Sequence, residues 1–435
     1  MLVWHGQSIK ETTLARSSWA MHADNRYRTV PESKVIDFLV LAGWAHAGAD
    51  EDVSKHAGNA LERSVELGVK YQLSKAGDRL FDPVEVINQL KWSGRNGLDR
   101  FWIDHFVETE RSRVSQFAGQ DAEMFGPDAL RFLRFEVSLI RSFDLSVFAP
   151  GTKVLLRLPL PYASDLTRDV QAVVSEAASC SFAVTKHAER LDIRLEVPRQ
   201  QSIEIATRIS FATRGVEGLP ATGRLDTKQS EIYLREKEGL IHVSPAVSAR
   251  ARSFVTGDDW KTASALWNFL LGEFTCGMIH YDQIPAQAPG DWVLDSGWHD
   301  CQLGAALFVS MCRSCGIPSR LLSGYLLYQF TPTFHYWAEV WIEGRGWVPF
   351  DFLCWDLSQG GQENRWRDYF RGQLDYRMVT QCMPLIFTGP MSTKFPPAWH
   401  MIATRAAGGV EVCFQELGGR LIYRDRVAVL GSREP

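Results

Sequence analysis

The spacing of hydrophobic and polar residues divides the chain into three segments. From the start to about residue 130, apolar residues recur every three to four positions, which is typical of helices that bury one face. Asp82 followed by Pro83 marks a helix start, because aspartate caps the first turn and proline suits the first helical position. We therefore predict a helical N-terminal domain over residues 1–130. Its clearest apolar stripe comprises Leu61, Val65, Val69 and Leu73.

The pattern changes to strict alternation between about residues 131 and 235. Alternating apolar and polar residues indicate strands with one buried face, as at 133–139 and 191–197. The run Leu158–Pro161 ends one of these strands, because proline cannot donate to the ladder of hydrogen bonds. We predict a small antiparallel β-domain over residues 131–235.

The remainder, residues 236–435, mixes both periods. Asp258 or Asp259 is placed to cap one helix, and a second helix starts near Cys301 and stops at Gly316, just before Pro318. The sequence thus predicts an α+β fold whose third domain spans 236–435. We expect its strands at 319–328, 334–342, 347–352, 379–388, 410–416 and 420–430.

Composition narrows the class of protein. The 435 residues are 45% hydrophobic and 23% charged, as in ordinary globular proteins, and the formal net charge is -4. This charge gives no reason to expect nucleic acid or an anionic membrane as partner. The run 35–42 is too short to span a bilayer, and the first residues lack the order of a secretion signal. We therefore expect a cytoplasmic protein.

One of the eight cysteines has a distinctive position. Cys301 lies in the first turn of a predicted helix, where unpaired N–H groups and the helix dipole favour a thiolate and could stabilise an oxyanion. The other cysteines are expected to pack in cores. Cys312 and Cys315 could begin a zinc site, but no second ligand pair follows, so we predict no metal.

A predicted hairpin downstream supplies a base and an orienting carboxylate. His335 lies on its first strand and Asp351 ends its second, around a glycine-containing loop at 343–346. A two-residue loop would set Asp351 opposite Ala338, on the other face from His335. A three-residue loop shifts Asp351 opposite Trp337, diagonal to His335 and within about 7–8 Å, so the two side chains could meet.

These residues lie within motifs that resemble the transglutaminase-like superfamily, a branch of the papain-like thiol enzymes. The motifs are Gly316–Arg320, His335–Val340 and Gly346–Asp351, and the resemblance covers about 240–355. It implies a papain-like transglutaminase core, preceded by the β-domain and the N-terminal helical domain, that needs no cofactor. The triad it implies comprises Cys301 as nucleophile, His335 as base and Asp351 as the group that orients the base.

Other side chains receive weaker assignments. Trp298, Trp292 and the Cys301 backbone N–H are candidate oxyanion donors, because the resemblance supplies no matching side-chain donor. Trp337 and Trp341 are candidate walls of the cleft. His299 is an alternative base, disfavoured because it lies only two residues before the nucleophile. Arg320 is expected to pair with a buried carboxylate.

Three functions remain open at this stage. The first is acyl transfer, in which Cys301 forms a thioester and an amine takes the acyl group; one variant forms amides from carrier-protein thioesters. The second is a cysteine peptidase or amidase, in which water is the acceptor. The third is a non-catalytic binding scaffold. The expected substrate of either enzyme is a peptide, a protein or a carrier-bound acyl group.

Overall fold

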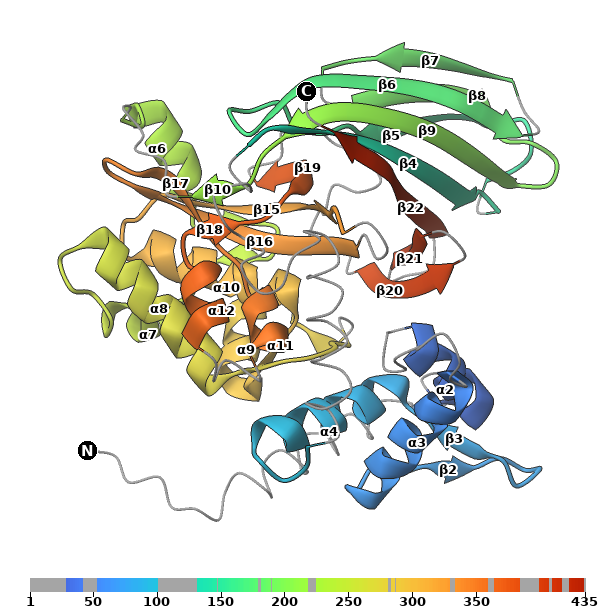
Figure 1. Cartoon of the computed structure of the whole chain (residues 1–435), viewed down its shortest axis with the longest axis horizontal. Helices are drawn as coiled ribbons and strands as arrows, with labels where there is room; N and C mark the ends of the chain where they lie inside the picture. Colours follow the sequence, from blue (N-terminus) through green and yellow to red (C-terminus); the bar gives the residue numbers. More distant parts are fainter. Residues whose placement is uncertain are drawn as a thin grey trace. The chain divides into compact units, whose positions relative to one another are not determined.

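The computed structural model divides the chain into two compact units, Met1–Phe106 and Val107–Pro435. Each unit is described by itself, and Figure 1 shows the elements of both. The structure describes residues 29–41, 53–100, 131–146, 148–178, 181–188, 190–217, 224–280, 283–285, 287–328, 333–358, 364–383, 399–406, 409–416 and 422–433.

In the described residues of the first unit, helices α2, α3 and α4 accompany a small sheet in the order β1-β3-β2. Asp82 caps α4 by accepting the N–H of Val84 at 2.9 Å, as the Asp-Pro pair predicts. Its core includes Leu39, Leu61 and Leu90. The elements are β1 (Val30–Pro31), α2 (Glu32–Leu41), α3 (Val53–Glu66), β2 (Gln72–Leu73), β3 (Arg79–Phe81) and α4 (Pro83–Arg95).

The stripe from Leu61 to Leu73 does not form one helix. Helix α3 ends at Glu66, and Gly68 takes a left-handed φ of 108°, which reverses the chain. Leu73 then lies in β2 with 67% of its surface exposed. The prediction of a purely helical domain is therefore wrong for this stretch. Residues 101–130 of the predicted domain lie outside the described residues.

The alternating segment of the second unit forms long antiparallel strands, as predicted. Buried and exposed positions alternate along β9, and the run Leu158–Pro161 ends β5 at Pro159. Figure 1 shows the three-stranded sheet β5-β8-β7 lying against a curved sheet that contains β4, β9 and β6. The strands are β4 (Leu133–Asp144), β5 (Lys153–Pro159), β6 (Thr167–Ala178), β7 (Phe182–Lys186), β8 (Arg190–Glu196), β9 (Ser202–Thr213) and β10 (Val216–Glu217).

The curved sheet also contains the last strands of the chain. Its order is β20-β21-β22-β4-β9-β6. The strand β22 therefore pairs with β4, although the two strands are far apart in the sequence. The predicted boundary at residue 235 therefore does not separate the domains completely, because these strands belong to the β-domain's sheet and not to the third domain. They are β20 (Trp399–Ala406), β21 (Gly409–Glu416) and β22 (Ile422–Arg433).

The rest of the unit is built on the antiparallel sheet β17-β16-β15-β19. Figure 1 shows α7 to α12 on one face of this sheet. The elements are α6 (Thr227–Tyr233), β11 (Lys237–Glu238), β12 (Ile241–His242), α7 (Pro245–Arg252), α8 (Asp259–Glu273), β13 (Thr275–Cys276), α9 (Pro289–Ser296), β14 (Trp298–His299), α10 (Cys301–Ser314), β15 (Ser319–Leu326), β16 (Thr333–Ile342), β17 (Gly346–Phe350), α11 (Leu353–Leu357), α12 (Asn364–Tyr369), β18 (Gln373–Leu374) and β19 (Arg377–Met383).

Helix α10 is the central helix of this part, and its residues from Gln302 to Arg313 are buried. An aromatic cluster fixes it against α8 and the sheet: the Trp267 ring centroid lies 4.4 Å from that of Phe352, and Phe308 lies 4.9 Å from Phe350. Aromatic packing of this kind combines large buried area with specific geometry. The first turn of α10 is thereby held in a defined place relative to β16 and β17.

The β-domain is tied to β18 and β19 by main-chain contacts. Val379 O accepts the N–H of Tyr162 at 2.7 Å, and β10 pairs with β18. The hydroxyl of Tyr376 donates to Arg131 O at 3.0 Å. The segment from β18 to β19, which carries charged residues near the candidate site, is therefore held at both ends.

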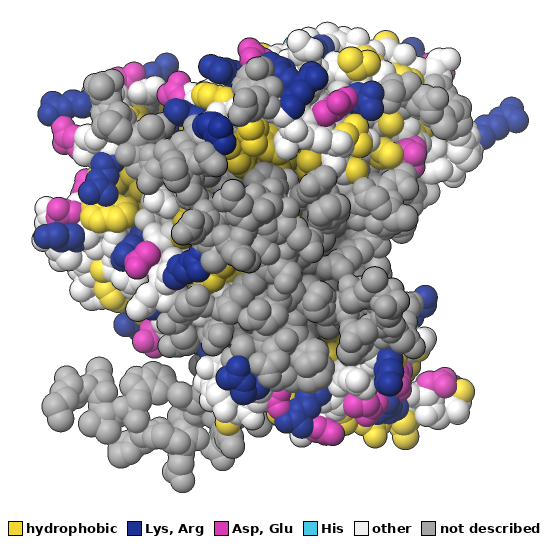
Figure 2. Space-filling model, in the orientation of Figure 1, with side chains coloured by type: hydrophobic (Ala, Val, Ile, Leu, Met, Phe, Trp, Pro, Cys, Tyr) yellow, Lys and Arg dark blue, Asp and Glu magenta, His cyan; other side chains and the backbone are white. Residues whose placement is uncertain are grey.

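Charges of both signs occur on the visible face of the part that the structure describes (Figure 2). Among the described residues, no helix combines the length and the hydrophobicity that crossing a bilayer requires.

Candidate active site

Cys301 is the first residue of α10, and the preceding residues fix its position. Asp300 caps the helix by accepting the N–H of Leu303 at 2.8 Å. Gly297 ends α9 with a left-handed φ of 75°, and the two residues of β14 pair in parallel with β13. The turn, the short strand and the cap together place the thiol at the start of the central helix.

The thiol of Cys301 lies against the hairpin strand β16. It accepts a hydrogen bond from the backbone N–H of Tyr336, which lowers its pKa. Burial among packed atoms and the charge of Asp300 raise the pKa more strongly, although part of the residue stays exposed. These two effects therefore oppose the lowering of the Cys301 pKa that a helix N-terminus is expected to give.

The hairpin has the register that brings His335 and Asp351 together. Ala338 pairs with Phe350 and Ile342 with Gly346, which leaves a three-residue loop and extends to Asp351 opposite Trp337. The predicted shift through a glycine-containing loop is thus confirmed. His335 Nε2 lies 2.7 Å from Asp351 Oδ1, and both side chains are buried.

Asp351 binds two further donors. Its Oδ1 accepts the N–H of Leu353 at 2.7 Å, and its Oδ2 forms an ion pair with Arg377. Burial opposes ionisation of Asp351, but the charges of Arg377 and His335 outweigh it and lower its pKa to about 2. The carboxylate is therefore ionised at neutral pH and fixes His335 Nε2 as the donor nitrogen, leaving Nδ1 for another proton.

Arg377 belongs to a charged cluster that the sequence did not indicate. Its Nε donates to Asp375 Oδ1 at 2.8 Å, and the Tyr328 hydroxyl donates to the other oxygen of Asp375. All three side chains are buried. The motif Asp375–Tyr376–Arg377 resembles an ordinary polar segment in the sequence, so only the fold shows that it lies behind the hairpin.

The two predicted cleft tryptophans lie at different places along β16. Trp337 is 1% exposed and stacks between His335 and Arg377, with centroid distances of 6.5 Å to the imidazole and 4.7 Å to the Arg377 Cζ. Trp341 is six residues from His335 along β16, about 20 Å away, and packs edge-on against Trp347 at 5.5 Å. Neither indole therefore forms the open wall of a cleft at the thiol.

The candidate oxyanion donors flank the start of α10. Trp298 lies in β14, three residues before Cys301, and Trp292 lies in α9; both side chains are partly exposed. The Cys301 N–H lies in the first turn of α10, where N–H groups have no acceptor within the helix. Because Asp300 already takes the Leu303 N–H, the Cys301 N–H remains available to a negatively charged oxygen.

His299 is not placed as the base. It is 0% exposed, its ring lies 5.1 Å from that of Phe352, and its Nδ1 faces Asp300 O at 3.0 Å. The packing is close enough that a methyl group on Gly304 would lie 2.5 Å from His299 Nδ1. His299 is therefore a core residue beside the turn that leads into α10.

Arg320, Cys312 and Cys315 have structural positions. Arg320 pairs with Glu339 on the neighbouring strand, with Nε 2.7 Å from Oε2, as its predicted role requires. Cys312 is buried in α10, and Cys315 ends that helix. Within the described residues, no group of three or more His, Cys, Asp or Glu side chains is arranged to hold a metal ion.

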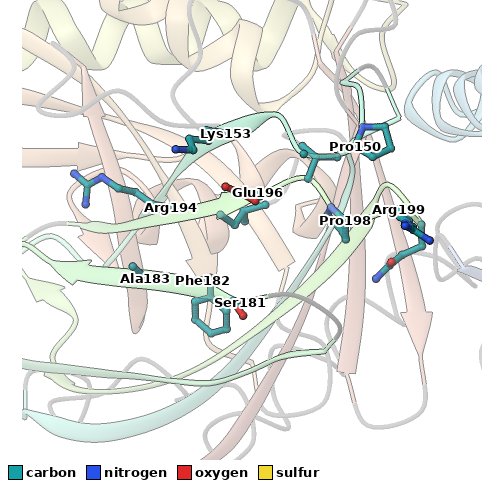
Figure 3. Close-up of a pocket in the computed structure, with 13 residues that line it drawn as sticks. Pro150, Lys153, Ser181, Phe182, Ala183, Arg194, Glu196, Pro198 and Arg199 are labelled. Carbon is teal, nitrogen blue, oxygen red and sulfur yellow. The ribbon is translucent and has the colours of Figure 1, made fainter.

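A broad concavity of about 1110 Å³ lies away from this site, on the β-domain. Figure 3 shows its lining residues on β5, β7, β8 and the loops beside them, among them Lys153, Phe182, Arg194 and Glu196. The residues that line it include no cysteine and no histidine. None of the three candidate triad residues lines this concavity, which is a separate surface.

Residues 248–352 match the family model of the transglutaminase-like superfamily, which includes Cys301, His335 and Asp351. Comparison with curated protein sequences gave no match.

Several solved structures are similar. A candidate cysteine protease from Cytophaga hutchinsonii aligns with a TM-score of 0.39 and 12% identity, over 69% of this chain and 98% of that one. The periplasmic domain of TgpA from Pseudomonas aeruginosa aligns with a TM-score of 0.29 and 16% identity, over 54% and 91%. A candidate protease from Parabacteroides distasonis gives 0.24 and 10%, over 65% and 67%.

Proposed function

We propose that this chain is a cysteine acyltransferase, because residues 248–352 match the family model of the transglutaminase-like superfamily. Cys301 is the nucleophile, His335 the base and Asp351 the group that orients the base. The observation that carries the proposal is the joint placement of the three: the Cys301 thiol bonds the backbone of Tyr336, next to His335, whose Nε2 lies 2.7 Å from Asp351.

The first half-reaction forms a thioester. His335 Nδ1 takes the proton of the Cys301 thiol as sulfur attacks the acyl carbonyl carbon, and Asp351 stabilises the imidazolium that results. The tetrahedral intermediate collapses by breaking the bond to the leaving group. The leaving amine or thiol takes the proton from His335, and the acyl group remains on Cys301.

The second half-reaction releases the acyl group. An amine attacks the thioester carbonyl and loses a proton to His335, and the intermediate collapses with Cys301 sulfur as the leaving group. Sulfur regains its proton from His335, so the enzyme returns to its resting state with an amide as product. The Cys301 N–H, together with Trp298 or Trp292, is the proposed source of hydrogen bonds to the oxyanion.

An amine is the proposed acceptor because the thiol is desolvated. Cys301 is only partly exposed, and burial is the largest cause of its raised pKa, which supports a site that admits little water. Such a site protects a thioester from hydrolysis until a bound nucleophile arrives. The proposed acyl donor is a peptide, a protein or a carrier-bound thioester, and the alternative is a peptidase or amidase in which water takes the acyl group.

The partition of the acyl group tests the proposal. The full-length protein is given one acyl donor and a graded series of amines, and amide and free acid are quantified. The expected result is amide formation that saturates with amine concentration and is absent in Cys301→Ala. Hydrolysis at every amine concentration would replace the transferase by the peptidase or amidase. A protein whose Cys301 gives no acyl adduct with any donor would support the binding scaffold instead.

A further inference from the structure

Three buried side chains behind the triad form one connected group, the Arg377 cluster of Tyr328, Asp375 and Arg377. Arg377 pairs with Asp351 through NH1, while its Nε donates to Asp375 Oδ1 at 2.8 Å. Tyr328 donates its hydroxyl to the second oxygen of Asp375. Two of these residues, Asp375 and Arg377, lie outside the 248–352 segment that matches the family.

The cluster fixes the orientation of Asp351 from behind. The Asp351 side chain is 0% exposed, so a carboxylate with only one partner would carry a large desolvation cost. Arg377 takes the oxygen that His335 does not use, which leaves Oδ1 directed at the imidazole. The guanidinium also lies over the Trp337 ring, and that ring stacks with His335 at an interplanar angle of 15°.

The charges of the cluster also affect how strongly an imidazolium at His335 is stabilised. Arg377 alone would neutralise Asp351 and weaken its attraction for an imidazolium. Asp375 shares the same guanidinium, so the two carboxylates and one guanidinium together keep a single negative charge. Tyr328 adds none, because burial and the charge of Asp375 raise its pKa well above the usual value and it stays protonated.

We infer that Asp375 and Arg377 are positioning residues for the triad: Arg377 orients the Asp351 carboxylate, and Asp375 preserves the negative charge that stabilises the His335 imidazolium. This inference rests on the proposed function, because it assigns the role through His335. The β-domain supports the arrangement, since Thr213 Oγ1 lies 3.4 Å from Arg377 O and Tyr162 N donates to Val379 O at 2.7 Å.

The test uses the reactivity of Cys301 and needs no known substrate. The rate of its alkylation by iodoacetamide is measured in the full-length protein from pH 5 to pH 10 by peptide mass spectrometry. The quantity compared is the rate at pH 7 divided by the rate at pH 10, which rises with the share of thiolate–imidazolium pairs at pH 7. The charged groups that face this pair are Asp300, Asp351, Asp356 and Arg377, with Asp375 behind Arg377.

Asp375→Asn is expected to lower this ratio about five-fold, because the imidazolium loses a nearby negative charge. Asp375→Glu restores the charge and should return the ratio to within about two-fold of the wild type. The matched control is Glu339→Gln, which removes the carboxylate of another buried arginine pair on β16, about 13 Å along the strand from His335. That variant should leave the ratio unchanged.

Tyr328→Phe removes only one hydrogen bond to Asp375 and should lower the ratio less, in the same direction; it serves if Asp375→Asn fails to fold. A folded Asp375→Asn protein with the wild-type ratio would overturn the inference. The His335→Ala variant separates this outcome from failure of the proposed function. If His335→Ala also keeps the wild-type ratio, the triad itself is wrong; if only His335→Ala lowers it, the triad stands and the Arg377 cluster is purely structural.

Discussion

His335 Nε2 lies 2.7 Å from Asp351 Oδ1, at the end of a hairpin whose three-residue loop sets the register. This contact fixes the tautomer of the imidazole, so that Nδ1 is the nitrogen that takes the thiol proton in the proposed mechanism. We predict that Asp351→Asn lowers kcat about 10²- to 10⁴-fold, because an amide neither holds this tautomer nor stabilises an imidazolium. Turnover of the variant is compared with that of Glu339→Gln, and comparable activity in both would assign the orienting role to another residue.

The charge of Asp300 opposes ionisation of Cys301. Asn is as good a helix cap as Asp, so Asp300→Asn should keep α10 intact while removing the charge that raises the pKa of the thiol. We expect alkylation of Cys301 at pH 7 to become about two- to five-fold faster in a His335→Ala background, where the imidazole makes no contribution. If Asp300→Asn is alkylated no faster in this background, the capping hydrogen bond of Asp300, and not its charge, determines the reactivity of Cys301.

Gly324 allows β19 to approach β15 behind His335. It lies opposite His335, and a methyl group there would overlap the Met378 carbonyl oxygen and lie 2.9 Å from Val379 Cα. Because backbone cannot move aside easily, Gly324→Ala should destabilise the protein by about 3 kcal/mol and displace Arg377 from Asp351.

Gly272→Ala is the matched control for that substitution. Gly272 lies in α8 with open space at its Cβ position, so alanine there should raise stability by about 0.5–1 kcal/mol. Unfolding in urea measures both variants. If Gly324→Ala were as stable as Gly272→Ala, the close approach of β19 would not be a constraint.

The ionisation of Asp351 makes the free energy of unfolding depend on pH in the acidic range. Its pKa is lowered to about 2 in the folded chain, below the value of an unfolded aspartate near 3.9. The stabilisation is therefore present above about pH 4 and is lost as the pH falls toward 2, by about 2 kcal/mol in total. The free energy of unfolding, measured in urea between pH 5 and pH 2, should fall more steeply with decreasing pH for the wild type than for Asp351→Asn. Parallel curves would mean that Asp351 keeps an ordinary pKa.

Much of the site follows from local pattern. Cys301 at a capped helix start and the hairpin register of Asp351 depend on residues close together in sequence, and the structure has both. Arg377 could not be found in this way, because its ion pair with Asp351 depends on β19 lying beside β15. A charged residue in a short strand carries no sign of its partner when that partner comes from another strand.

The same limit applies to the fold. Alternation predicts that β22 has a buried face, but it does not say which sheet the strand joins, and β22 pairs with β4 of the β-domain. Helical spacing likewise extends past Glu66 to Leu73, whereas the left-handed Gly68 ends the helix. Trp337 and Trp341 share a face of β16, yet strand length alone separates Trp341 from the thiol.

The most direct test of the central claim is to trap the acyl group on the nucleophile. The full-length protein is incubated with acyl thioesters and glutaminyl peptides, quenched in acid, and analysed by intact mass and peptide mapping. We predict one acyl group on the peptide that contains Cys301, no adduct in Cys301→Ala, and discharge of the adduct when an amine is added. Product formation with an acyl group on any other residue, or undiminished turnover by Cys301→Ala, would contradict the account.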